Sequence, residues 1–209
     1  DSTPYVDWLL VTKRPENVAR MWPENILVRD SVDGRSPFAD GSPQYYRPNV
    51  WILTSVATQV DADRNLPHLV ACRDLAPALG VSAEPLLEPV DFSRWSSSLD
   101  WIITGGESGH GARPCPIDAI RSIVDQCRAA SVACFVKQLG AYAVDHARHR
   151  PDWSGRGPAV DVVATTVVDG VRGEPSTIRI RTKHAKGGDA EEWPRSLRVR
   201  EFPEVQVAV

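Results

Sequence analysis

The strongest structural signal in this chain of 209 residues lies in residues 100–138, which read DWIITGGESGHGARPCPIDAIRSIVDQCRAASVACFVKQ. The apolar run at 100–104 predicts a strand, and a glycine-rich turn follows at 105–113. Pro116 is placed to open a helix, because proline suits the first helical turn. Apolar residues then recur at helical spacings of three, four and three: Ile117, Ile120, Val124 and Cys127. With a further strand predicted at 132–136, the segment forms a strand–helix–strand unit.

The same alternation extends toward the N-terminus. Residues 5–12 predict a strand that runs into a helix at Pro15, and the β-branched run at 49–56 predicts a strand buried on both faces. We expect a helical segment over 61–79, interrupted by two prolines, and a third strand over 81–87. Strands that alternate with helices pair in parallel through right-handed crossovers, so the sequence predicts an α/β sheet or barrel.

The C-terminal third follows a different pattern. Two β-like stretches, at 160–168 and 176–181, precede a polar segment. We therefore expect a βα portion over residues 1–140 and a small C-terminal elaboration over 141–209 that packs on the same domain. Residues 27–48, rich in Asp, Gly, Ser, Pro and Tyr, predict a long surface loop, and loops of this length are often functional.

Composition places the chain among folded globular proteins. The 27 acidic and 24 basic residues give a net charge of -3, so the chain lacks the strong positive field of a non-specific nucleic-acid binder. Hydrophobic residues make up 42% of it, and no apolar run approaches the roughly 18 residues that a membrane span needs. We expect one domain and no membrane partner.

The cysteines and histidines do not indicate a metal site. The four cysteines contain no C-x-x-C pair and no zinc-like spacing, so neither a structural metal nor a disulfide scaffold is predicted. Among the five histidines no pair has metal-ligand spacing on an evident helix. We expect buried free thiols in a reducing bacterial cytoplasm.

Polar residues follow the predicted strands, at the end of a parallel sheet where ligands bind. In chain order these residues are Lys13 and Arg14, Ser55, Glu84, the turn at 105–109, and Lys137 with Gln138. Glu84 falls within or just after the third predicted strand. A charge, a hydroxyl or a glycine-rich turn at every carboxyl end predicts a functional rim. Glu84 and Lys137 fit acid–base work in a cavity, because burial and an opposite charge shift a pKa. They would equally form an ion pair that closes one end of a barrel.

Two glycine-containing segments also allow two interpretations each. At 105–109, glycines let a ligand approach the backbone and Glu107 supplies a carboxylate, or else Gly105 and Gly106 only make a tight turn. The spacing does not match the dinucleotide-binding or P-loop patterns. Residues 186–189 (KGGD) form either an anion-binding loop or a turn with Trp193 as an aromatic anchor.

Six segments of the chain resemble one family. They read LVTKRPENV (10–18), NVWILTSV (49–56), AEPLLEPV (83–90), DWIITGGESGHGARP (100–114), DQCRAASVACFVKQLG (125–140) and KGGDAEEWPRSLRVREFP (186–203). In this order they resemble the phage three-Cys-motif family, which phages and prophages encode and whose function is uncharacterised. The chain departs from the family at Leu139, where an aromatic residue is expected, and at Ala57 and Thr58, where relatives tend to be acidic or amide-bearing.

The resemblance implies a radical S-adenosylmethionine protein: a partial, TIM-like βα barrel whose N-terminal loop carries three cysteines that bind a 4Fe-4S cluster. That loop would precede Asp1, so the resemblance implies that the chain is either the later strands and tail of a longer protein or a variant that has lost the cluster. In both cases no cysteine here corresponds to a cluster ligand, and we expect the chain alone to be inactive. In such enzymes a Gly-Gly-Glu motif contacts the methionine amine of the cofactor. By analogy Gly105, Gly106 and Glu107 are candidate cofactor-binding residues, although here the motif follows a late strand.

Three hypotheses for function follow. The first is an enzyme whose rim binds S-adenosylmethionine and a nucleotide or nucleic acid substrate. Its catalytic candidates are Lys13, Arg14, Glu84, Glu107 and Lys137. The second is a non-catalytic phage protein that binds a host or phage partner through the loop at 27–48 and the C-terminal arginines Arg195, Arg198 and Arg200. The third is nucleic-acid binding by the basic tail alone.

Overall fold

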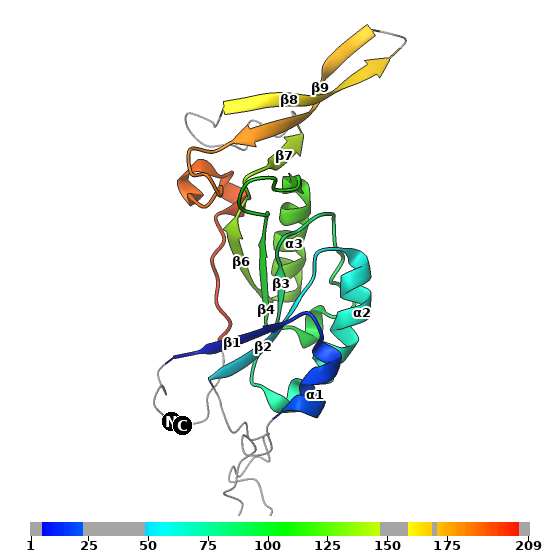
Figure 1. Ribbon diagram of the computed structural model, residues 1–209, viewed down its shortest axis with the longest axis vertical. Helices are drawn as coiled ribbons and strands as arrows, with labels where there is room; N and C mark the ends of the chain where they lie inside the picture. Colours follow the sequence, from blue (N-terminus) through cyan, green and yellow to red (C-terminus); the bar gives the residue numbers. More distant parts are fainter. Residues whose placement is uncertain (1–5, 23–48, 147–158, 169–170, 205–209) are drawn as a thin grey trace, which may run out of the picture.

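The computed structural model describes residues 6–22, 49–146, 159–168 and 171–204 (Figure 1). At its centre lies a five-stranded sheet with the order β1-β2-β3-β4-β6, in which all neighbours are parallel. Its strands are β1 (Trp8–Thr12), β2 (Val50–Ser55), β3 (Leu79–Ala83), β4 (Trp101–Gly105) and β6 (Ala133–Gln138). The predicted α/β class is therefore confirmed.

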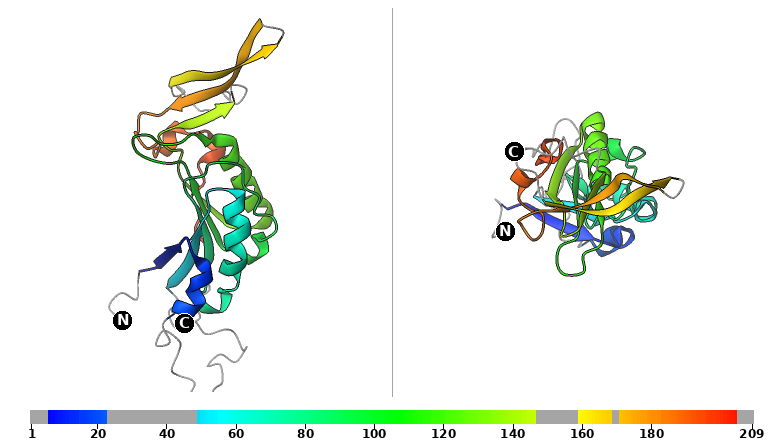
Figure 2. Two further views of the ribbon diagram at one scale, coloured as in Figure 1. Left: turned by 45° about the vertical axis from the view of Figure 1, so that its right-hand side comes forward. Right: turned by 90° about the horizontal axis from the view of Figure 1, so that it is seen from above.

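The two longer helices cover one face of this sheet (Figure 2). Helix α2 (Gln59–Val70) begins after Thr58, whose side chain accepts the N–H of Asp61. Helix α3 (Ile117–Ala130) begins after Pro116 as predicted, and its predicted apolar face is buried. A short helix, α1 (Val18–Met21), follows β1 after the 3-10 turn Pro15–Asn17. Further 3-10 turns span Arg73–Leu75, Ser96–Ser98, Ala190–Glu192 and Arg195–Leu197.

The helix predicted over 61–79 is too long. Helix α2 ends at Val70, and Leu79 begins β3, which therefore starts earlier and ends sooner than the predicted 81–87. Pro77 has no N–H for a helical hydrogen bond and disfavours helical backbone at Ala76, which is extended. Pro67, in contrast, lies inside α2, where it removes a single helical bond.

The two faces of the sheet bury different residues. Ile52, Val81 and Ile102 belong to the main core that the helices cover. On the other face, the Trp101 ring lies 5.8 Å from that of Trp51 and 5.4 Å from that of Phe202, measured between centroids. This aromatic cluster packs the C-terminal segment onto the face that the helices leave uncovered.

The two edges of the sheet differ as well. The N–H of Val136 donates to the Val199 carbonyl at 2.9 Å and the N–H of Glu201 donates to the Cys134 carbonyl at 2.8 Å, so the C-terminal segment covers the β6 edge. At the other edge, the β1 side chains from Trp8 to Val11 are each 42% to 51% exposed. Within the described residues the sheet is open, and a closed barrel is not shown.

A second sheet lies beyond the carboxyl ends of the parallel strands (Figure 1). Its order is β5-β7-β9-β8. The strands are β5 (Cys115–Pro116), β7 (Ala143–His146), β8 (Ala159–Val168) and β9 (Val171–Arg181). The two predicted β-like stretches are confirmed as β8 and β9, although β9 begins before residue 176. The loop predicted at 27–48 lies outside the described residues.

Candidate functional site

Parallel pairing brings the carboxyl ends of the five strands to one edge of the sheet. The pairs nearest this edge are Thr12 with Thr54, Ser55 with Ser82, Ala83 with Thr104, and Gly105 with Gln138. Lys13 and Glu84 each follow directly on a strand end, and Lys137 is the extra residue of an irregularity in β6. The strand-end positions of these residues are as predicted, and their chemical roles stay predictions.

A cavity of about 150 Å³ lies at this edge. Its lining comes from three strand ends and from α2: Lys13, Ser55, Val56, Ala57, Asp61, Arg64, Asn65, Glu84 and Pro85. Asp61 accepts the N–H of Ala57 at 3.1 Å and pairs with Arg64 at 2.9 Å, so the α2 wall is internally satisfied. Sequence reasoning missed this wall, although the capping pattern Thr58-x-x-Asp61 marks this end of α2.

Glu84 and Lys137 form an ion pair across the edge. Lys137 Nζ lies 3.0 Å from Glu84 Oε2, and the lysine side chain is 57% exposed whereas the glutamate is 13% exposed. The structure thus forms the ion pair that was one of the two interpretations of these residues. Because the lysine reaches in from solvent, the carboxylate is the deeper group of the pair.

The second oxygen of Glu84 lies against β4. Glu84 Oε1 is buried and has no hydrogen-bond partner among the described residues. A Cβ at Gly105 would lie 2.8 Å from this oxygen and 2.7 Å from the Gln138 carbonyl oxygen, closer than side chains tolerate. Glycine at 105 therefore lets Glu84 occupy this position. Since a buried carboxylate oxygen needs a donor, a ligand N–H or O–H would gain a hydrogen bond here.

Glu107 has a partner of its own. Its carboxylate accepts the backbone N–H of Arg113 at 2.9 Å and the Arg113 side-chain Nε at 2.9 Å. These hydrogen bonds lower the pKa of Glu107 to about 2. A carboxylate that stays ionised and holds an arginine is a poor proton donor, so the geometry assigns Glu107 to closing the loop 107–113.

The predicted rim residues Gly106, Gln138 and Arg14 lie outside the lining of the cavity. Gly106 lies so close to the Leu139 carbonyl that a side chain would collide with it, and Gln138 Nε2 donates to the Gly106 carbonyl at 2.9 Å. These contacts fit the interpretation of the glycines as a tight turn. Arg14 does not line the cavity, and its exposed side chain leaves its predicted role without support.

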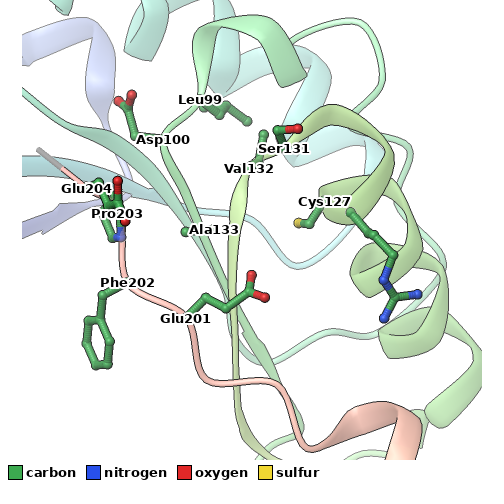
Figure 3. A pocket seen from close by; sticks show the side chains of 11 residues that line it. Leu99, Asp100, Cys127, Ser131, Val132, Ala133, Glu201, Phe202, Pro203 and Glu204 are labelled. Carbon is green, nitrogen blue, oxygen red and sulfur yellow. The ribbon is translucent and has the colours of Figure 1, made fainter.

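A larger cavity, of about 570 Å³, lies at the opposite, amino end of the sheet (Figure 3). It separates the end of α3 from the C-terminal segment, and Figure 3 shows Glu201 and Cys127 on its walls. None of the predicted site residues lines it. Because ligands of parallel α/β sheets bind at the carboxyl ends of the strands, the smaller cavity is the candidate site.

All four cysteines are buried free thiols, Cys72, Cys115, Cys127 and Cys134. Cys127 and Cys134 are hydrogen-bonded to each other, and this contact together with burial raises the pKa of the Cys134 thiol. Burial raises the pKa of the Cys115 thiol to about 12. Within the described ranges, no three His, Cys, Asp or Glu side chains gather in a way that could hold a metal ion.

The C-terminal arginines are largely used inside the protein. Arg198 pairs with Glu191 at 3.0 Å, and the Arg200 guanidinium lies over the rings of Phe135 and Trp193. Of the three arginines in the hypothesis of tail-mediated binding, Arg198 is thus bound within the tail and Arg200 packs the tail against β6.

Comparison with known proteins finds one relationship. No curated protein and no solved structure matches the chain. None of the helices in the described part is long and apolar enough to cross a membrane. A family model described as "Protein of unknown function (DUF5131)" matches residues 1–192. The chain therefore belongs to the DUF5131 family.

Proposed function

We propose that the carboxyl edge of the parallel sheet is the cofactor and substrate site of a phage-encoded radical S-adenosylmethionine enzyme that acts on a nucleotide or a nucleic acid. The observation that supports this proposal is how the two carboxylate oxygens of Glu84 are placed. One of its oxygens is held by Lys137, and the other is buried against Gly105 beside the cavity without a donor among the described residues.

S-adenosylmethionine fits the residues at this edge. Its amine and ribose hydroxyls are donors for Glu84 Oε1, and its carboxylate suits the Lys13 ammonium, which lines the same cavity. When bound, the cofactor supplies the reactive group. The chain contributes binding and orientation: Lys137 fixes the Glu84 carboxylate, and Gly105 keeps β4 free of a side chain there. Glu107 is engaged by Arg113, so we assign the donor contact to Glu84 instead.

The 4Fe-4S cluster does not fit the described residues, because their cysteines are buried and no three of them gather in one place. We propose, following the family resemblance, that its ligands belong to a segment upstream of Asp1. The β1 edge supports this part of the proposal: its apolar side chains are about half exposed, whereas the β6 edge is covered. Earlier strands of a partial TIM-like barrel would pair with β1 and bury them.

Binding of S-adenosylmethionine tests the proposal. In calorimetric titrations, Glu84→Gln should weaken binding by about tenfold or more, the loss expected for one charge-assisted hydrogen bond. Glu204→Gln removes the same charge at the opposite end of the sheet and serves as the matched control. Absence of binding to the unsubstituted protein, or equal affinity of both variants, contradicts the assignment of Glu84.

The cluster is tested separately. The chain is produced anaerobically together with its upstream coding region, and the absorption spectrum is recorded. We expect an iron–sulfur absorption band. Its absence despite three upstream cysteines contradicts the radical part of the proposal without affecting the titration.

The exposed β1 edge also favours the second candidate function, a non-catalytic protein that binds a host or phage partner. A strand with half-exposed apolar side chains on both faces, which pairs with β2 alone among the described strands, can accept a strand from another protein. Substituting Leu10 by Glu should abolish capture of such a partner from host lysate. Capture that survives this substitution, or that is absent from the start, contradicts this candidate.

A further inference from the structure

A loop from the C-terminal part of the chain lies at the same edge of the parallel sheet as the candidate site. The N–H of Leu139 donates to the Gly187 carbonyl at 2.9 Å, and the N–H of Gly140 donates to the Lys186 carbonyl at 3.1 Å. Gly140 in turn lies against Gly106, since a Cβ on Gly140 would be 2.8 Å from the Gly106 Cα. The loop 186–188 therefore lies beside the Gly-Gly-Glu turn at the carboxyl edge, although no strand of the parallel sheet leads into it.

The backbone of this loop is held from several sides. His184 Nδ1 accepts the N–H of Lys186 at 3.3 Å and that of Gly188 at 3.1 Å. The buried indole N–H of Trp193 donates to the Gly187 carbonyl at 2.9 Å. Gly187 has a φ of 59°, and a Cβ there would lie 2.8 Å from the Gly140 carbonyl oxygen, so glycine is required on both counts.

These contacts decide between the two interpretations of the KGGD segment. The amide groups of Lys186 and Gly188 point to His184, so they do not form an anion-binding nest. Trp193 anchors the turn as the second interpretation predicts. The Lys186 side chain is exposed, and no ion pair with another described residue engages it. The loop therefore presents one ammonium group at the edge of the site.

The edge and the adjoining loop carry a small excess of positive charge. Their cations are Lys13, Arg14, Arg64, Arg113, Lys137, Lys183 and Lys186, and their carboxylates are Asp61, Glu84, Glu107, Asp189 and Glu192. Three of the carboxylates are paired with cations, Asp61 with Arg64, Glu84 with Lys137 and Glu107 with Arg113. The whole chain has a net charge of -3, so this excess is local. A local excess of cations around a cavity attracts an anionic ligand group.

We propose that Lys186 binds a phosphate group of the substrate, and that the substrate is accordingly a phosphate-bearing nucleotide or oligonucleotide. This inference rests on the proposed function, because it takes the carboxyl edge as the site of reaction. Lysine binds phosphate as a charged donor, and the docked loop fixes where its backbone starts. The C-terminal part of the chain thus contributes a specificity-determining residue that no strand end supplies.

Fluorescence anisotropy with a fluorescein-labelled single-stranded oligonucleotide tests this inference on the full chain. Lys186→Ala should weaken binding about tenfold and reduce the slope of log affinity against log salt by about one. Lys186→Arg should restore binding. Lys183→Ala is the matched control, because Lys183 is also an exposed lysine. Its backbone N–H donates to the Glu192 carboxylate, and the substitution leaves this backbone contact in place. It should bind as the unsubstituted protein does.

Competition identifies the source of the phosphate. AMP should displace the labelled oligonucleotide if the substrate is a mononucleotide. If the substrate is a nucleic acid, only unlabelled oligonucleotide should displace it. Adenosine, which has no phosphate, should not displace it in either case. The inference is overturned if neither AMP nor the oligonucleotide binds, or if Lys186→Ala binds the oligonucleotide with normal affinity. It is also overturned if Lys183→Ala weakens binding as much as Lys186→Ala does, or if adenosine competes. A parallel titration with S-adenosylmethionine separates the two proposals. Lys186-dependent phosphate binding without cofactor binding overturns the proposed function and leaves the phosphate site standing.

Discussion

Replacing Gly105 by alanine should destabilise the protein through two identifiable contacts. The new Cβ would lie 2.7 Å from the Gln138 carbonyl oxygen and 2.8 Å from Glu84 Oε1, and real Cβ atoms essentially never come closer than 3.0 Å. Overpacking of this kind costs about 1 to 3 kcal/mol. For a chain of this size each kcal/mol lowers Tm by about 2 to 4 °C, so we expect a fall of about 2 to 12 °C.

The contact with Glu84 can be isolated by a double-mutant cycle. Glu84→Ala removes the oxygen that the new Cβ would meet, whereas the Gln138 carbonyl stays in place. The loss in free energy of unfolding caused by Gly105→Ala should therefore be smaller in the Glu84→Ala background, by about 1 kcal/mol. Urea denaturation of the four proteins, followed by circular dichroism, measures this coupling. Equal costs in the two backgrounds would refute the placement of Glu84 against β4, and a neutral Gly105→Ala would refute the close packing itself.

Three further predictions concern the loop, a helix cap and the thiols. Arg113→Gln should raise the pKa of Glu107 from about 2 toward its ordinary value, so that the carboxylate protonates near pH 4; a carboxyl NMR titration with an unchanged midpoint would contradict this. Because the folded-state pKa is lowered, the stabilisation from this pair is present above the ordinary pKa and is lost as pH falls toward about 2. Thr58→Ala should destabilise the protein by about 1 kcal/mol, since the Asp61 N–H loses its cap, and an unchanged denaturation midpoint would speak against the cap. A disulfide reagent at pH 8 should label the native thiols slowly and all four after unfolding, because burial holds the Cys115 pKa near 12; rapid labelling of the native protein would show that the thiols are accessible.

Local sequence patterns predicted most of the parallel layer. The apolar period of α3 and the β-branched run of β2 reflect burial, which the chain encodes residue by residue. The prediction failed where two signals competed: the segment 61–79 has helical composition throughout, but Pro77 and the return to the sheet end the helix at Val70. The strands β5 and β7 were not predicted, because a two-residue and a four-residue strand carry too little periodicity.

The candidate site was only partly predictable. The rule that ligands meet the carboxyl ends of parallel strands placed Lys13, Glu84 and Lys137 at one edge, and the structure bears out these positions. The rule could not choose between partners. Glu84 pairs with Lys137 across 53 positions of sequence, and Glu107 with Arg113 only six residues away, because side-chain reach and strand register set these pairs.

The sequence by itself determined the α/β class, the parallel order of elements and the chemical types at each strand end, because hydrophobic periodicity and turn residues act locally. Only the tertiary structure decided which of those groups meet. It covered one sheet edge with the C-terminal segment and left β1 exposed, it buried one oxygen of Glu84 against Gly105, and it docked the KGGD loop beside Gly106. Each of these outcomes depends on close backbone approach between segments distant in the chain, and no local pattern records such distances.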